Sequence, residues 1–127
     1  MTIWHGLRQA FLVAATAGLF ASTALAHHGW SWAEDEQTEL SGAIQEIFIG
    51  PPHPSLQVET TDGIWTVDLG NPSQTERSGF NAESAAEGDE ILVLGNRSLD
   101  RNEKRMKAVR ITVNGTTYDI YPERIGS

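Results

Sequence analysis

The sequence has no cysteine among its 127 residues. Disulfide bridges, iron–sulfur clusters, thiolate zinc sites and cysteine nucleophiles are therefore excluded. Basic residues are also scarce, with 9 Lys and Arg against 17 Asp and Glu and a formal net charge of −8. Nucleic-acid binding needs clustered cations that displace counterions from phosphates, so this composition argues against that class of function.

Five of the nine basic residues lie in one segment, RNEKRMKAVR at 101–110. We interpret this segment as a solvated hairpin and strand edge, with a local anion contact as the alternative. Signatures of catalysis are missing as well, because the sequence has no GxSxG nucleophile motif and no lysine in the loop GNPSQ at 70–74. Asp62 and Asp68 are expected to be solvated residues on strand faces rather than a catalytic pair. We therefore predict no enzymatic activity.

A long uncharged stretch, rich in Ala, Leu and Phe, occupies residues 10–26. It ends in Ala24-Leu25-Ala26, whose small residues fit a signal-peptidase site. We predict that 1–26 is a signal peptide cleaved after Ala26, and that the mature protein begins at His27 and is periplasmic or secreted. Cleavage after Ala24 is a minor alternative. A retained membrane anchor is disfavoured because the apolar run is short and diluted by small residues.

The rest of the chain reads as an irregular polar arm at 27–39, followed by one small domain at 40–127. Apolar alternation and turn residues predict that the domain is built from strands. The apolar positions of the first strand change phase between Ile44 and Ile47, and Gly42 lies inside the strand, which indicates a long, bent strand with a bulge. The strand at 90–98 is the most apolar, so we expect it to be central. The predicted strands are 40–49, 55–60, 64–69, 90–98, 105–113 and 116–121.

A short helix is predicted between the third and fourth strands, because Asn71 can cap it, Pro72 fits its first position and Gly79 follows its end. Three strands, a helical connection and two or three further strands predict an all-β domain. We expect a five- to six-stranded barrel of the oligonucleotide/oligosaccharide-binding (OB) type, with a small sandwich as the alternative. Such a fold does not by itself specify a function.

Several short motifs occur in a distinctive order along the chain. They are His27-His28-Gly29-Trp30, SGAIQEI at 41–47, Pro52-His53-Pro54, Trp65, Leu69, Pro72, Gly79 and Gly88-Asp89. In these motifs the chain resembles a family of small exported bacterial proteins known as domain of unknown function 6152. The resemblance implies export, small size and this fold, and no established activity. Members commonly carry asparagine where this chain has Pro51, so the hydrogen bonds of that side chain cannot be made here.

Three histidines follow the predicted cleavage site: His27, His28 and His53. If His27 is the N-terminal residue, its amine and its Nδ1 can chelate one metal ion, and a second imidazole can complete a set of three nitrogens. Nitrogen ligands in a tetragonal plane suit Cu(II). His53 is a pre-set ligand because prolines flank it on both sides. We therefore predict a periplasmic copper carrier or buffer that uses His27, His28 and His53, with further contacts from Glu34 or Asp35.

The alternative is a non-catalytic module that binds a ligand or a periplasmic protein without a metal. Two histidines at a cleavage site can be no more than a poorly ordered chain end, and His53 can be a satisfied loop residue. The binding surface would then be the loop GPPHP at 50–54 with the aromatic residues Trp30, Trp32, Trp65, Phe80, Tyr118 and Tyr121. The sequence leaves open whether His27 and His53 meet, because they flank the first strand at opposite ends. Neither hypothesis involves nucleic acid or a membrane.

Overall fold

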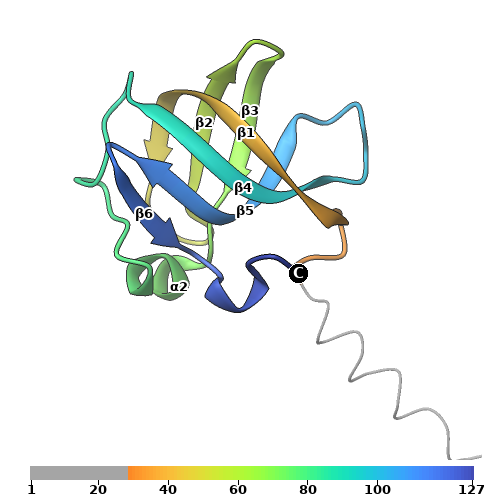
Figure 1. The fold of residues 1–127 in the computed structure, drawn as a ribbon. Helices are drawn as coiled ribbons and strands as arrows, with labels where there is room; N and C mark the ends of the chain where they lie inside the picture. The colour runs from red at the N-terminus through yellow and green to blue at the C-terminus, as the bar shows by residue number, and fades with distance from the viewer. Residues whose placement is uncertain (1–28) are drawn as a thin grey trace, which may run out of the picture. The chain divides into compact units, whose positions relative to one another are not determined.

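The computed structural model describes residues 29–127, and residues 32–127 form one compact unit. In chain order the elements of this unit are β1 (Ala33–Phe48), β2 (Ser55–Thr60), β3 (Gly63–Asp68), α2 (Pro72–Arg77), β4 (Glu90–Ser98), β5 (Arg105–Val113), β6 (Thr116–Asp119) and the 3₁₀ helix η2 (Pro122–Arg124). Figure 1 shows these elements as a curled sheet with α2 below it. The predicted all-β class with a short helical connection is confirmed.

The strands lie in one sheet in the order β3-β2-β1-β4-β5-β6. An additional parallel pairing joins Thr66–Asp68 of β3 to Arg105–Lys107 of β5 and closes five of the strands into a ring. We call this pairing the closing seam. A ring of five strands with a helical connection between the third and fourth is the predicted OB-type barrel, and the closure rules out the sandwich. β4 pairs with both β1 and β5, so its predicted central place is confirmed.

β1 is long because its first part pairs with one strand and its last part pairs with another. It pairs with β4 from Ala33 to Ala43 and with β2 from Ala43 to Phe48. The register on β2 shifts between Ile44 and Glu46, which confirms the predicted bulge. Gly42 lies at the bend, where an added Cβ would be 2.2 Å from the backbone oxygen of Glu59. The bulge also explains why the apolar phase of this strand changes in the sequence.

The predicted irregular arm at 27–39 is partly wrong, because β1 already begins at Ala33. Gln37 pairs with Asn96 of β4, and Thr38 pairs with Gly95. This segment is polar and gives no strand pattern of its own. It becomes a strand because its backbone groups form hydrogen bonds with β4, while Asp35, Glu36 and Glu39 keep their side chains exposed.

α2 begins as the sequence predicts. The Asn71 side chain accepts a hydrogen bond from the Gln74 amide at 2.8 Å, and Pro72 occupies the first turn. Gly79 follows with φ of +92°. Phe80 then enters the core fully buried, with its ring edge against Tyr118 at a centroid distance of 5.3 Å. The connection therefore covers one end of the barrel.

The core is made of inward side chains of the strands together with Leu69, Phe80 and Ile120 from the segments that follow β3, α2 and β6. The fully buried large residues are Ile44, Leu56, Val58, Val67, Leu69, Phe80, Val93, Met106, Val109, Ile111, Val113 and Ile120. None of the helices in the described part of the chain has the length and hydrophobicity needed to span a bilayer.

Candidate functional site

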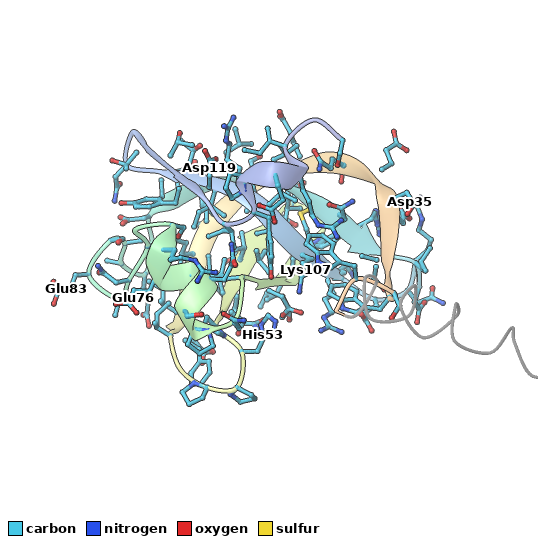
Figure 2. All side chains as sticks on the ribbon, turned by 90° about the horizontal axis from the view of Figure 1, so that it is seen from below. Asp35, His53, Glu76, Glu83, Lys107 and Asp119 are labelled. Carbon is cyan, nitrogen blue, oxygen red and sulfur yellow. The ribbon has the colours of Figure 1, made fainter. Side chains whose placement is uncertain are left out.

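His53 lies in the loop between β1 and β2 (Figure 2). Its side chain is half-buried, and its Nδ1 lies 3.2 Å from the carbonyl oxygen of Pro54. A carbonyl oxygen can only accept, so this hydrogen bond requires the tautomer with the proton on Nδ1. Nε2 then carries the lone pair and is the nitrogen that can bind a metal ion.

The loop that carries His53 is fastened to the end of β3. The amide of Leu69 donates to the carbonyl of Pro54 at 3.0 Å, and Ser55 pairs with Asp68 across the β2–β3 ladder. Pro54 is itself buried. His53 is therefore one residue away from an anchored position, beside the closing seam.

The other two predicted ligands, His27 and His28, lie outside the described residues. Within residues 29–127, no three His, Asp or Glu side chains gather closely enough to hold a metal ion. Glu34, one of the expected further contacts, forms an ion pair with Arg101 at 2.8 Å. Asp35 is exposed. Of the predicted metal ligands, the structure therefore positions His53 alone.

An ion pair and a stacked ring cover the closing seam on its outer side. Arg105 donates from Nε and Nη2 to Oδ2 of Asp68, at 2.9 and 2.6 Å. The same guanidinium lies over the ring of Trp32, 3.8 Å from its centroid. Trp32 is also attached through its backbone, because its carbonyl accepts the amide of Leu99 at 2.9 Å. Arg105 thus joins the residue that precedes β1 to the last residue of β3.

A buried lysine lies beside this ion pair. Lys107 pairs with Asp68 on one side and with Asn96 on the other, and only 4% of it is exposed. Burial lowers the pKa of Lys107, and the charge of Asp68 partly opposes this shift. The ring of Tyr121 lies 5.6 Å from Nζ of Lys107, and burial raises the pKa of that tyrosine. The seam is therefore a polar, partly buried patch on the outside of the barrel.

Two expectations from the sequence are wrong here. Asp68 was expected to be solvated, yet it is 7% exposed and paired with Arg105. The segment 101–110 was interpreted as a solvated hairpin and strand edge; residues 101–104 form an exposed turn, but Arg105–Lys107 pair with β3 and are not a free edge. The apolar alternation along the two strands does place Asp68, Arg105 and Lys107 at outward-facing positions. The sequence does not indicate that β3 and β5 pair, because no short turn joins two parallel strands from distant segments.

The aromatic residues expected to form a ligand platform mostly pack inward. Trp65 is 4% exposed and Phe80 is fully buried. Tyr118 and Tyr121 are partly buried against the same core. Arg97 lies 4.9 Å from the centroid of the Trp65 ring and covers it. The ring of Trp32 is covered by the guanidinium of Arg105.

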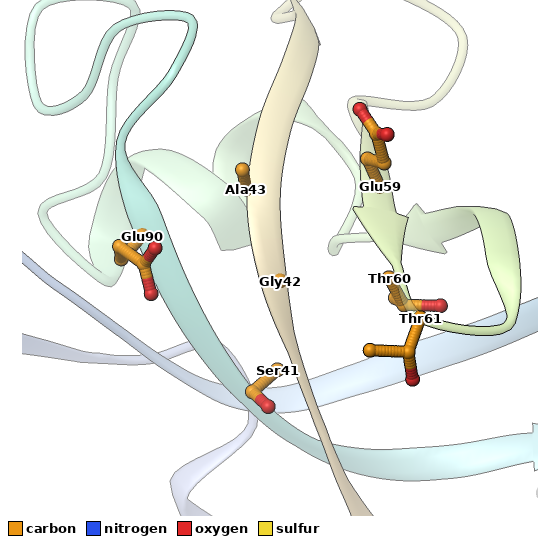
Figure 3. Close-up of a pocket in the computed structure, with 7 residues that line it drawn as sticks. All are labelled: Ser41, Gly42, Ala43, Glu59, Thr60, Thr61 and Glu90. Carbon is orange, nitrogen blue, oxygen red and sulfur yellow. The ribbon is translucent and has the colours of Figure 1, made fainter.

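A shallow depression of about 410 Å³ lies elsewhere on the barrel, where β1 passes from β4 to β2 (Figure 3). Small side chains of Ser41 and Ala43 form its floor together with Gly42. Glu59 and Glu90 flank it, because both pair with Ala43. Neither His53 nor any residue of the closing seam lines this depression.

Comparison with solved structures supports the fold alone. One similar structure is the crystal structure of the ZRD-deleted mutant of TiaS in complex with agmatine, with a TM-score of 0.51 and 15% sequence identity. The similarity covers 67% of this chain and 26% of that chain. This chain therefore corresponds to about a quarter of that protein.

Comparison with curated proteins gives no match. A family model does match, over residues 15–107, which is most of the chain and includes the His53 loop and the seam. This range also includes the motifs that carried the resemblance in the sequence. The chain belongs to the family of unknown function DUF6152.

Proposed function

We propose that this chain is an exported metal-binding protein, with copper as the expected metal, that acts as a carrier or buffer. The ion would be held by the amine and Nδ1 of His27 after signal cleavage and by Nε2 of His53, with His28 as a further ligand. One observation carries the proposal. The curled barrel brings the beginning of β1 and the loop after β1 to the same seam, through Trp32, Arg105 and Asp68.

The reach of the chain is compatible with this arrangement. Arg105 contacts Trp32, and only β3 separates β5 from β2, which begins two residues after His53. Two strand spacings correspond to about 10 Å. A fully extended segment from His27 to Trp32 would reach about 18 Å, and the turns at residues 29–32 shorten this reach. A chain of this length can therefore fold back onto the His53 loop.

The chemistry of the donors also favours copper. The sequence has no cysteine, so a thiolate site is excluded, and its two methionines give little support to a thioether site. An amine and imidazoles are the nitrogen donors that Cu(II) accepts in a tetragonal plane. The hydrogen bond from Nδ1 to Pro54 would fix the orientation of the His53 ring and its tautomer, as such bonds do for metal-bound histidines.

The test is a Cu(II) titration followed by electron paramagnetic resonance (EPR), on protein that the cell has exported and processed. We expect one tight site with a nitrogen-rich tetragonal spectrum. One extra residue before His27 and the substitution His53→Ala should each abolish it. Glu83→Gln, in an exposed loop, is the control for non-specific carboxylate binding and should leave the site unchanged.

Weak or multiple binding that neither the extension nor His53→Ala alters would overturn the proposal. The function would then have to be sought at another surface, and the acidic depression beside Ala43 would be the first place to examine.

A further inference from the structure

We infer that Trp65, Arg97 and Lys104 bind the carboxylate or phosphate group of a small molecule at the end of the barrel where β3 begins and β4 ends. We call these three residues the donor cluster. They include no residue of the proposed metal site, so the inference goes beyond the proposed function and does not depend on it. In Figure 1 the loop between β4 and β5, which carries Lys104, lies on the other side of the curled sheet from α2.

Two hydrogen-bond donors of the cluster are buried without a partner. They are Nε1 of Trp65 and Nε of Arg97, and both atoms are shielded from solvent. Arg97 lies over the ring of Trp65, with Cζ 4.9 Å from the ring centroid, so the two donors belong to one stacked pair. A buried donor without an acceptor is destabilising and is rare in folded proteins. The stacked pair therefore has a hydrogen-bonding capacity that the fold itself does not use.

The positive charges of the cluster also have no carboxylate partner within residues 29–127. Neither Arg97 nor Lys104 forms an ion pair with a described residue, and Asp62 in the adjoining turn binds neither of them. The neighbouring Arg101 and Arg105 are both paired with carboxylates. In a chain with 17 acidic and 9 basic residues, most cations can find an acid. Two neighbouring cations without one are therefore available to an anionic ligand.

Gly63 brings the lysine of the cluster to the same side as the tryptophan. Gly63 and Trp65 are two residues apart on β3, so their Cβ positions lie on the same face of the strand. A Cβ added to Gly63 would lie 3.7 Å from Nζ of Lys104 and 3.4 Å from its Cε. The ammonium group therefore lies on the Trp65 face, one pleat along the strand. Because residue 63 is glycine, no side chain of β3 separates the ammonium from the ring.

An oxyanion would satisfy all three members of the cluster. Arg97 is half-buried, and a small shift of its side chain would open Nε1 of Trp65 to a ligand. One ligand oxygen would then accept the indole N–H, and another would accept from the guanidinium, whose planar fork suits carboxylate and phosphate. The exposed Lys104 supplies a second positive charge. A metal cation does not fit, because all three groups donate hydrogen bonds and two of them are positive.

The experiment follows the indole N–H signal of Trp65 by NMR in isotope-labelled, cell-processed protein. Sodium phosphate or sodium acetate is added at an ionic strength held constant with sodium chloride, and Trp65→Phe assigns the signal. We expect a saturable downfield shift with at least one of the two anions, because the indole N–H gains an acceptor. The anion that binds more tightly shows whether the natural ligand carries a phosphate or a carboxylate group.

Three variants test the residues of the cluster against general electrostatics. Arg97→Gln should weaken anion binding about tenfold or more, because a charge-assisted hydrogen bond is lost. Lys104→Gln removes an exposed charge and should weaken it about two- to fivefold. Arg77→Gln is the matched control, since Arg77 is an exposed arginine on α2 and its loss changes the net charge equally. This variant should bind the anion like the parent protein.

The remaining outcomes would overturn the inference. A shift that grows without saturating, or that sodium chloride alone reproduces, would show non-specific screening. Equal weakening by Arg97→Gln and Arg77→Gln would lead to the same conclusion. If Arg97→Gln does not fold by circular dichroism, Lys104→Gln decides, because Lys104 is exposed and its replacement leaves the core intact. Parent-like affinity in Lys104→Gln would then overturn the inference, and a selective loss would support it.

Discussion

The guanidinium of Arg105 lies 3.8 Å from the centroid of the Trp32 ring. Trp32 immediately precedes β1, and Arg105 is the first residue of β5. Through Asp68 the same arginine reaches β3, whose end is fastened to the loop that follows β1. One side chain therefore links the segments on either side of a 16-residue strand.

The Asp68–Arg105 pair should be more strongly coupled than the Arg110–Asp119 pair. The side chain of Asp68 is 9% exposed, whereas that of Asp119 is 36% exposed, and water screens an exposed pair more effectively. A double-mutant cycle with Asp68→Asn and Arg105→Met should give a coupling free energy of about 1–2 kcal/mol by urea unfolding. The cycle on Asp119 and Arg110 should give a smaller value. Equal couplings would contradict the claim that burial strengthens the seam pair.

Phe80→Ala should strongly destabilise the barrel. The side chain is fully buried and packs its edge on Tyr118, so its removal leaves a cavity under the connection. We expect the free energy of unfolding to fall by about 3–5 kcal/mol in chemical denaturation. Phe48→Ala removes the same atoms from a side chain that is 45% exposed, and its effect should be clearly smaller. Comparable losses at the two positions would mean that Phe80 does not cover the core.

Gly42→Ala should also destabilise the fold, because the added Cβ would lie 2.2 Å from the oxygen of Glu59 and 2.9 Å from Cγ1 of Val58. The closer neighbour is backbone, so relief requires β1 and β2 to move apart. We expect a loss of about 1–3 kcal/mol, as for other overpacked sites. Ser41→Ala, at an exposed neighbouring position, should have little effect on the unfolding midpoint. A neutral Gly42→Ala would show that the bend tolerates a side chain.

Asp89 should titrate below its ordinary pKa of 3.8, because its carboxylate accepts hydrogen bonds from the Asn114 side chain and the Ala86 amide. A lowered folded-state pKa stabilises the fold above pH 3.8, and this contribution is lost as the pH falls through the folded-state pKa. NMR titration of the carboxyl carbon should show the lowered midpoint.

Asn114→Gly is the informative variant for this pair. Asn114 has a φ of +52°, which glycine adopts without strain, so the change removes the amide and keeps the turn. The pKa of Asp89 should rise toward its ordinary value in this variant. An unchanged midpoint would mean that the Asn114 bond does not form in solution.

The local features of the fold could be read directly from the sequence. The strands at 55–60, 90–98 and 105–113 have the predicted bounds, and Asn71 caps α2 as expected. Asn114-Gly115 forms the predicted hairpin turn, with positive φ at both residues. Each of these depends on side-chain alternation or on backbone preferences of neighbouring residues, which the sequence carries without reference to distant segments.

For the candidate site too, some features could be predicted from the sequence and others required the tertiary structure. The sequence predicted His53 as a ligand held between prolines, and this role and the copper site with His27 and His28 remain predictions. Only the tertiary structure showed that Asp68 and Lys107 are buried and that Arg105 lies on Trp32. It also decided that the polar residues from Ala33 onward form a strand. These features depend on the pairing of β3 with β5 and of β1 with β4, and such long-range pairings follow from burying one common core rather than from any local pattern.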